Sequence, residues 1–343
     1  DLVAAIDQAV RDGVDVISYS ISGTRTNFLD PVSVSFMYAA RAGIFVATSA
    51  GNNGPTVSTV AHPGPWVTTV AAGTHNRGAM GSVTLGDGTT YYGPSLAAAA
   101  VTAPLIDSVA AGIAGADPMM LALCYSSLDG GNMLDSAKVA GKIVVCDRGT
   151  TARVNKSYAV MEAGGVGMIL VNISSTQSLN ADFHSVPTVH LAFADRAAVK
   201  AYAAMDGATA TINAAVLDYS TPAPYTAEFS SRGPLLAGNG DLLKPDVMAP
   251  GVDVLAAVSP ASGGGVDFNL YSGTSMSTPH VAGVAALLIQ AHPDWTPMMI
   301  KSALMTSAYD ILDGPNTHPL VIFRQGAGFI QPNGAFDPGL VYN

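Results

Sequence analysis

Helical and strand-like hydrophobic patterns alternate at the start of the chain, and this alternation limits the fold more than any other feature. An apolar stripe with the spacing of an amphipathic helix comes first, made of Leu2, Ala5, Ile6 and Ala9. An apolar run at 14–21 then predicts a buried strand, and the order repeats with a helix after Asp30 and strands at 44–50 and 66–72. Strands separated by helices pair in parallel through right-handed crossovers. We therefore predict an α/β fold, a parallel sheet with helices on both faces.

The pattern changes after residue 91. A Gly-Asp-Gly turn at 86–88 predicts a hairpin, and the regular alternation is lost beyond it. We expect a smaller α/β domain at 92–221, inserted into a first domain that comprises 1–91 and 222–343. Within the insert we predict strands at 142–146 and 167–171 and helices at 155–163 and 194–205. After the insert we predict two apolar helices, at 278–292 and 296–309.

The composition excludes several classes of protein. Acidic residues outnumber basic ones by 25 to 15, which leaves a net charge of −10, so we expect no nucleic-acid partner. An apolar content of 49% excludes a disordered chain. The longest apolar stretches, at 96–106 and 281–289, are too short to cross a membrane, so we expect no membrane contact.

The sequence offers no cofactor or metal site. The glycine-rich segment at 164–167 follows a predicted helix and precedes a strand, the reverse of the order in a dinucleotide-binding loop. No two histidines show metal-ligand spacing with a carboxylate. We therefore expect no cofactor and no metal.

A serine stands at the mouth of a predicted apolar helix. Ser275 lies in the run 273–280, just before the apolar stripe that begins at Val281. Free N–H groups and the positive end of a helix stabilise negative charge on a neighbouring oxygen, which suits a nucleophile. The alternative is that Ser275 is only the N-cap of its helix, and position alone favours that alternative.

Two polar segments follow predicted strands, at the edge where open α/β sheets bind ligands. Asn52 comes after the strand at 44–50, where its neutral amide is suited to donate hydrogen bonds to an oxyanion. The alternative is that Asn52 is only a turn residue that tolerates positive φ, and the turn context alone favours this alternative. The preceding strand ends in Ser20, Ile21, Ser22 and Gly23. The backbone of this segment can pair with an extended peptide. Together with Ser275 the segments are far more specific than each one alone.

These segments resemble the subtilisin-like serine proteases, and closely the cucumisin-like group, in which a protease-associated domain is inserted into the catalytic domain. The resemblance spans essentially the whole chain and rests on five runs in the family's order. They are Ala-Gly-Asn-Asn-Gly-Pro at 50–55, Phe-Ser-Ser-Arg-Gly-Pro at 229–234, Lys-Pro-Asp-Val-Met-Ala-Pro-Gly at 244–251, Gly-Thr-Ser-Met-Ser-Thr-Pro-His at 273–280 and Gly-Ala-Gly-Phe-Ile at 326–330. The resemblance implies a subtilisin-like fold and a serine endopeptidase (EC 3.4.21 class) with polypeptide substrates.

The resemblance also implies roles for single residues. Ser275 matches the nucleophile that forms an acyl-enzyme, and Asn52 matches the side-chain donor of the oxyanion hole. The segment from Ser20 to Gly23 matches the backbone rim of the specificity pocket. Ser22 stands where the family usually has glycine, so its side chain either narrows the entrance or faces away. His280 lies on another face of the helix from Ser275, and we expect it to be a structural histidine.

The insert and the cysteines are interpreted in the same way. The insert at 92–221 matches the protease-associated domain, which in relatives is linked to substrate selection and self-association. From their number alone, the two cysteines form one disulfide or remain free thiols. The resemblance implies a Cys124–Cys146 disulfide, because both flank the matching core of the insert, and it implies a secreted, extracellular protein.

The family's catalytic aspartate and histidine have no counterpart in the chain. In the family both precede the asparagine loop, whereas the first histidine here is His62, and no His-Gly-Thr segment occurs. The early aspartates stand in contexts that do not match, and they are Asp1, Asp7, Asp12 and Asp15. We expect an N-terminally truncated protease that is inactive alone, rather than a naturally shortened protein. The alternative function is a non-catalytic, protease-like scaffold that binds proteins.

Overall fold

The computed structural model describes residues 1–261, 266–314 and 318–343, and the chain divides into two compact units. Both units are discontinuous in sequence. The first consists of Asp1–Asn76, Pro222–Val254 and Tyr271–Asn343, and the second of Arg77–Thr221 and Leu255–Leu270.

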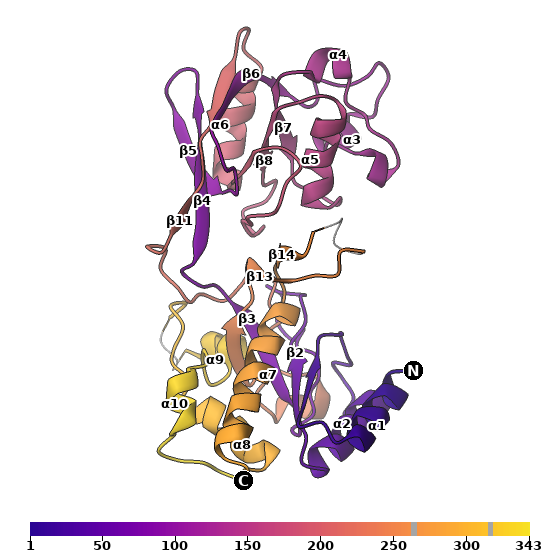
Figure 1. Ribbon diagram of the computed structural model, residues 1–343, viewed down its shortest axis with the longest axis vertical. Helices are drawn as coiled ribbons and strands as arrows, with labels where there is room; N and C mark the ends of the chain where they lie inside the picture. The colour runs from indigo at the N-terminus through magenta and orange to yellow at the C-terminus, as the bar shows by residue number, and fades with distance from the viewer. Residues whose placement is uncertain (262–265, 315–317) are drawn as a thin grey trace. The chain divides into compact units, whose positions relative to one another are not determined.

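A four-stranded parallel sheet forms the centre of the first unit (Figure 1). In spatial order its strands are β1 (Val16–Tyr19), β2 (Phe45–Ser49), β3 (Thr68–Gly73) and β12 (Val247–Pro250). The register places Val16 beside Phe45, and Val70 beside Val247. The parallel sheet predicted from the alternating pattern is confirmed.

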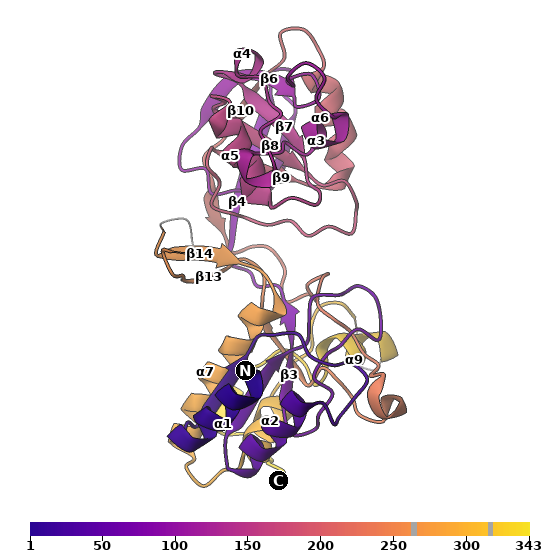
Figure 2. The ribbon, with the colours of Figure 1, turned by 90° about the vertical axis from the view of Figure 1, so that its right-hand side faces the viewer.

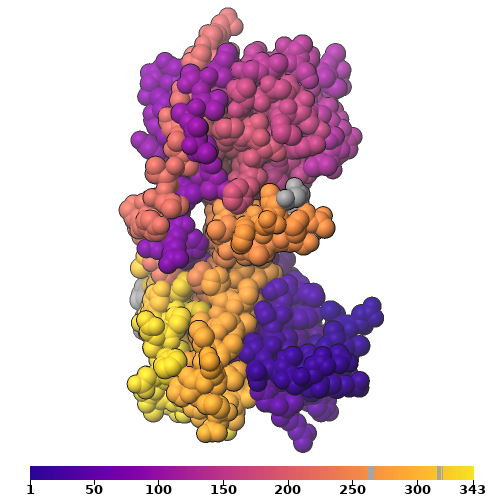
Figure 3. Space-filling view, viewed as in Figure 1, coloured from indigo at the N-terminus to yellow at the C-terminus, as the bar shows by residue number. Residues whose placement is uncertain are grey.

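Helices cover both faces of this sheet, as predicted. Alternate residues of a strand point to opposite faces. In β2, Val46 packs in one core with α1 and α2, whereas Phe45 and Ala47 pack in another with α7 and α8. Figure 2 shows α1 and α2 side by side, and Figure 3 shows α7 and the chain after it at the surface. The helices of the unit are α1 (Leu2–Asp12), α2 (Pro31–Arg41), α7 (Thr274–Ala291), α8 (Pro297–Thr306), α9 (Pro319–Gln325), α10 (Pro332–Phe336) and the 3-10 helix η2 (Ala237–Gly240).

Helix α7 begins four residues before the predicted helix at 278–292. Its first turn is polar and therefore lacks the apolar spacing on which the prediction rests. Pro279 also lies inside the helix, where it removes one hydrogen bond of the ladder. Contacts from distant parts of the chain hold this turn, as the site below shows.

The second unit is built on an eight-stranded sheet of mixed direction, in which β6 to β9 run parallel. In spatial order the strands are β11 (Val216–Asp218), β4 (Gly78–Leu85), β10 (Thr209–Ile212), β6 (Val101–Asp107), β7 (Ile143–Asp147), β8 (Gly167–Val171) and β9 (Thr188–Leu191), with β5 (Thr90–Pro94) paired to β4. The helices are α3 (Pro118–Ala122), η1 (Ser127–Asp129), α4 (Ser136–Val139), α5 (Arg153–Glu162) and α6 (Phe193–Ala203). A separate pair of strands consists of β13 (Val254–Ala257) and β14 (Phe268–Tyr271).

The expected domain boundary at residue 92 lies too late in the sequence. The second unit begins at Arg77, because β4 pairs with β5, β10 and β11 and therefore belongs to the second sheet. The segment Leu255–Leu270, which we expected in the first domain, also groups with the second unit. Strand pairing between residues more than a hundred positions apart decides this boundary, and no local pattern reports it.

Cys124 and Cys146 form a disulfide in the second unit. Both cysteines are fully buried, in a core that also contains Val144 and Leu170. The bond ties the segment after α3 to β7.

Within the described residues, no helix is long and apolar enough to cross a membrane. The same residues contain no group of three or more histidine, cysteine, aspartate or glutamate side chains that could hold a metal ion.

Candidate active site

The first unit brings Ser275 and Ser20 together. Ser275 lies in the first turn of α7, and Ser20 directly follows β1. The Ser275 Oγ donates to the Ser20 carbonyl oxygen at 3.2 Å, and the Ser20 Oγ donates to the Ser275 carbonyl oxygen at 3.1 Å. Two reciprocal hydrogen bonds therefore join residues that are 255 positions apart in sequence.

Ser275 is not the N-cap of its helix. The N-cap of α7 is Gly273, and no side chain caps this end of the helix. Ser275 is the second residue of the helix, and its hydroxyl points to the end of a neighbouring strand instead of to its own backbone. The N-cap alternative is therefore wrong.

Thr274 orients the amide of Asn52. The Asn52 Oδ1 accepts hydrogen bonds from the Thr274 backbone N–H at 3.0 Å and from the Thr274 Oγ1 at 2.9 Å. The Thr274 Oγ1 in turn accepts the backbone N–H of Gly51 at 3.2 Å. Of the two amide atoms of Asn52 only the oxygen can accept the Thr274 backbone N–H, so the Oδ1 faces Thr274 and the Nδ2 group turns away from it. The Nδ2 thus keeps two N–H donors in an exposed position.

The turn that carries Asn52 takes its positive φ from a different residue. Gly51 has φ 101°, whereas Asn52 is not among the residues with positive φ. The alternative in which Asn52 serves the turn by adopting positive φ is therefore wrong. A Cβ at position 51 would also approach the Ser231 Oγ to 2.9 Å, so glycine is needed there for space as well.

The run at 229–234 supports this turn. The Ser231 Oγ accepts the backbone N–H of Asn53 at 3.1 Å, and the Ser231 N–H donates to the Gly51 carbonyl at 2.9 Å. The Ser230 Oγ accepts the N–H of Ala72 in β3 at 3.0 Å. Two buried serines thus connect the asparagine turn to the sheet, a role that the sequence motif alone did not indicate.

His62 holds the strand edge from Ser20 to Gly23. Its Nε2 lies 2.8 Å from the Ile21 carbonyl oxygen, and burial lowers the pKa of the imidazole, so the neutral ring donates from Nε2–H. A Cβ on Gly23 would lie only 2.3 Å from the His62 Cε1, so the backbone at Gly23 passes close against the ring. The side chains of Ile21 and Ser22 are exposed. Sequence reasoning missed His62, because its partners follow a different strand.

The run at 244–251 carries a buried charge network. Asp246 lies between the ammonium groups of Lys244 and Lys301, at 2.5 and 2.8 Å, and accepts the N–H of Thr69 at 2.6 Å. Burial opposes ionisation of Asp246, but the two positive charges outweigh it and hold its pKa below the usual range. This network fixes the start of β12 beside β3, and none of its hydrogen bonds or ion pairs in the described structure reaches Ser275.

No imidazole or carboxylate hydrogen-bonds the Ser275 hydroxyl within the described parts of the chain. The His280 Nδ1 lies 2.8 Å from the Met276 carbonyl of its own helix, as expected of a structural histidine. Within the described residues, the site therefore combines a hydroxyl, an oriented amide and a strand edge, without an imidazole or carboxylate base in contact with the hydroxyl.

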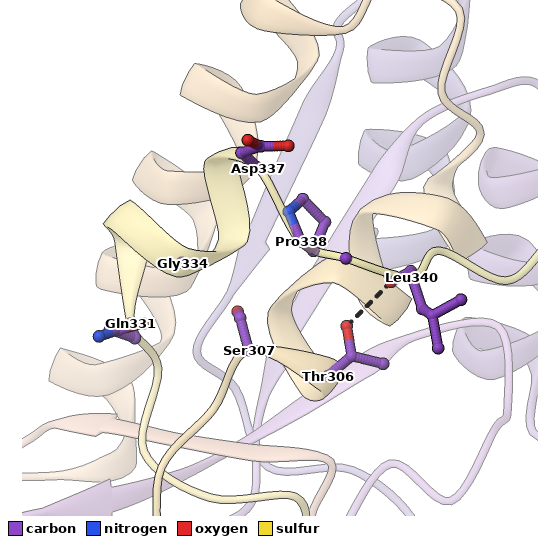
Figure 4. Close-up of a pocket in the computed structure, with 8 residues that line it drawn as sticks. Thr306, Ser307, Gln331, Gly334, Asp337, Pro338 and Leu340 are labelled. Carbon is purple, nitrogen blue, oxygen red and sulfur yellow. Dashed lines mark hydrogen bonds between the residues drawn. The ribbon is translucent and has the colours of Figure 1, made fainter.

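A hollow with a volume of about 470 Å³ lies elsewhere in the first unit (Figure 4). It is lined by the end of α8 and by the C-terminal segment, where the Thr306 Oγ1 donates to the Leu340 carbonyl at 3.2 Å. None of the predicted site residues lines it. The convergence around Ser275, and not this hollow, is therefore the candidate active site.

Comparison with known proteins gives the family to which this fold belongs. The subtilase family (peptidase S8) matches residues 1–328. The subtilisin-like proteases SBT1.3 and SBT1.6 of Arabidopsis thaliana are 42% and 41% identical over 366 and 370 residues. These alignments cover 100% of this chain and 46% and 47% of the two relatives, so the chain spans about half the length of the curated relatives it matches.

A solved structure is also similar, the psychrophilic subtilisin-like protease Apa1 from the Antarctic psychrotroph Pseudoalteromonas sp. AS-11. It is 20% identical with a TM-score of 0.41, and the match covers 98% of this chain and 73% of the other. On the family match and the two plant relatives, the chain belongs to the subtilase family, whose members are serine endopeptidases.

Proposed function

We propose that the chain supplies the nucleophile and the oxyanion-binding groups of a serine endopeptidase that acts on polypeptides. One arrangement supports the proposal most: the hydroxyl of Ser275, the oriented amide of Asn52 and the backbone edge after β1 meet in one place. A nucleophile, an oxyanion donor and a surface for an extended peptide are three of the groups that acyl transfer from a peptide requires, and a general base is the fourth.

In the proposed reaction an extended peptide lies beside the backbone from Ser20 to Gly23. The Ser275 Oγ attacks the scissile carbonyl carbon, and the carbonyl oxygen becomes an oxyanion that accepts hydrogen bonds from the Asn52 Nδ2 and the Ser275 N–H. The C–N bond then breaks, the amine leaves with a proton, and the acyl group stays on Ser275 until water releases it. In the family a histidine oriented by an aspartate takes the proton of the serine, and this chain has no counterpart of either.

We also propose that the protein is secreted and that the second unit acts as a protease-associated domain. The buried disulfide and the low, acidic charge support an extracellular location, where disulfides persist. In this proposal the second unit contributes to substrate selection and to self-association, while the first unit carries the chemistry.

A serine-directed fluorophosphonate tests the proposal in the protein expressed from its complete coding sequence. We expect one covalent label on Ser275 in the wild type and none in Ser275→Ala. Labelling that survives in Ser275→Ala would contradict the assigned nucleophile. For the 343-residue chain alone we expect no turnover of peptides, and Ser275-dependent hydrolysis by it would overturn that expectation.

The second candidate function is a non-catalytic scaffold that binds proteins. The lack of a base in contact with the Ser275 hydroxyl among the described residues favours it. The complete coding sequence separates the two candidates, because only the enzyme requires an aspartate segment and a His-Gly-Thr segment ahead of Asn52.

A further inference from the structure

The carbonyl oxygen of Ser275 lacks its ordinary helical partner. In an α-helix the carbonyl of one residue accepts the N–H of the residue four positions later. For Ser275 that residue is Pro279, which lies inside α7 and has no N–H. A helix carbonyl released in this way needs another donor.

Ser20 provides that donor. Its Oγ donates to the Ser275 carbonyl at 3.1 Å, and its own carbonyl accepts the Ser275 Oγ at 3.2 Å. We propose that Ser20 is a positioning residue whose hydroxyl replaces the helical hydrogen bond that Pro279 removes, and so holds the nucleophile's turn against the strand edge. The effect of this link on catalysis rests on the proposed function, whereas the link itself does not.

The other links of this turn lead to different parts of the unit. Thr274 binds the asparagine turn through Asn52, and the Ser277 Oγ donates to the Ala249 carbonyl of β12 at 3.0 Å. The pair with Ser20 is the one that connects the turn to the edge proposed to hold the peptide. Because the two hydrogen bonds are reciprocal, a displacement of either backbone changes both the place of Ser275 and the conformation of the edge.

Three substitutions separate this role from a general effect on stability. Ser20→Ala removes the donor, and Ser20→Thr keeps a hydroxyl. Pro279→Ala restores an N–H for the Ser275 carbonyl, and position 279 is exposed, so the change opens no cavity. Ser22→Ala is the matched control, because Ser22 lies on the same edge and its hydroxyl makes no hydrogen bond within the described residues.

The link itself is measured in the 343-residue chain by NMR hydrogen exchange at the amides of Met276, Ser277 and Thr278. A single neutral hydrogen bond corresponds to about a 3- to 10-fold change, so we expect exchange to be faster by that factor in Ser20→Ala. We expect no change in Ser22→Ala, or in the amides of β12. In the Pro279→Ala background Ser20→Ala should have no further effect. Unchanged exchange in Ser20→Ala, or an equal loss in both backgrounds, overturns the proposal.

The consequence for catalysis is measured in the protein from the complete coding sequence, as the rate of Ser275 labelling by a fluorophosphonate and as kcat and KM for a peptide. We expect a 3- to 10-fold slower labelling and a lower kcat in Ser20→Ala, near-normal values in Ser20→Thr, and no loss from Ser20→Ala when residue 279 is alanine. Wild-type rates in Ser20→Ala overturn the positioning role. If wild-type Ser275 does not label at all, the proposed function fails, while the exchange measurement still decides the link.

Discussion

Mild acid should destabilise the second unit, because two of its histidines are buried in the neutral form. The side chain of His184 is 6% exposed, and burial lowers its pKa to about 4. Burial, together with the charge of Arg148, lowers the pKa of His190 to about 3. An unfolded histidine titrates near 6.5, so both groups bind a proton on unfolding at any pH between these values.

The hydrogen bonds explain why both rings stay neutral. The Ser157 Oγ donates to the Val154 carbonyl at 2.7 Å, so the His184 Nδ1 must be the donor across its 3.0 Å contact with Ser157. The His184 Nε2 is buried without a hydrogen-bond partner in the described structure. The His190 Nε2 donates to the Asn172 Oδ1 at 2.8 Å, and its Nδ1 faces the backbone N–H of Asn180. A second proton on His184 would lie 4.0 Å from the Asp182 carboxylate, but burial of the ring outweighs this attraction and keeps its pKa low.

The magnitude follows from the pKa shifts. Because the folded pKa values are depressed, the stability contribution is complete above pH 6.5 and is lost as the pH falls towards 4 and 3. Each histidine costs about 1.4 kcal/mol per pH unit in that window, which is about 2 kcal/mol at pH 5 and about 4 kcal/mol for both. The pKa values of Asp129 and Asp182 in this unit are lowered from the ordinary value, so both carboxylates stay ionised between pH 7.5 and pH 5.

Hydrogen exchange of the β8 amides at pH 7.5 and pH 5, corrected for intrinsic rates, reports the free energy of opening of the second unit. We expect a fall of about 4 kcal/mol in the wild type and about 2 kcal/mol in His184→Asn, whose amide can still donate to Ser157 but does not titrate. His292→Asn, in the first unit, is the control and should keep the full fall. A pH dependence that is unchanged in His184→Asn would refute the reasoning.

Three further predictions concern single contacts. Asn52→Ala should slow the labelling of Ser275 in the protein from the complete coding sequence by about 10²–10³-fold, a magnitude measured on subtilisin itself. The control Asn53→Ala should leave the labelling rate within a few fold of the wild type. Equal effects of the two substitutions would show that Asn52 is not an oxyanion donor. Gly23→Ala should destabilise the first unit by about 1–3 kcal/mol in urea unfolding, because the new Cβ would lie 2.3 Å from the His62 ring. Gly283 in α7 has open space around it, so Gly283→Ala should raise the free energy of unfolding by roughly 0.5–1 kcal/mol. An unchanged free energy of unfolding in Gly23→Ala would mean that the backbone from Ser20 to Gly23 moves freely away from His62. Replacing both Cys124 and Cys146 by alanine should lower β8 protection by about 3 kcal/mol, because the disulfide closes a loop of 22 residues; unchanged protection would show that the crosslink does not stabilise this unit.

The elements of the fold could be predicted where one local pattern repeats. The strands at 44–50 and 66–72 and the two helices predicted at 155–163 and 194–205 lie close to their predicted places, because an apolar run or stripe reports burial directly. The prediction failed at the start of α7 and at the boundary before β4. In both places the structure depends on partners far away in sequence, Asn52 for the first and β10 and β11 for the second.

The same division holds for the candidate site. Ser275, Asn52 and the edge after β1 can be named from motifs, since each has a recognisable local context. The sequence could not predict that Thr274, Ser231 and His62 belong to the site, because each acts through hydrogen bonds to a backbone or side-chain atom of another segment. A single such bond leaves no periodic trace in the sequence.

By itself, the sequence determined the α/β class, the family and the residues that can do chemistry. These properties follow from side-chain type and short-range spacing, which are written along the chain. Only the tertiary structure decided that Ser275 is not a helix cap, that the Asn52 amide turns its N–H groups away from Thr274, and that a serine 255 positions away satisfies the carbonyl released by Pro279. The physical reason is that a hydrogen bond depends on the position and direction of two groups in space, and folding alone brings such distant groups together.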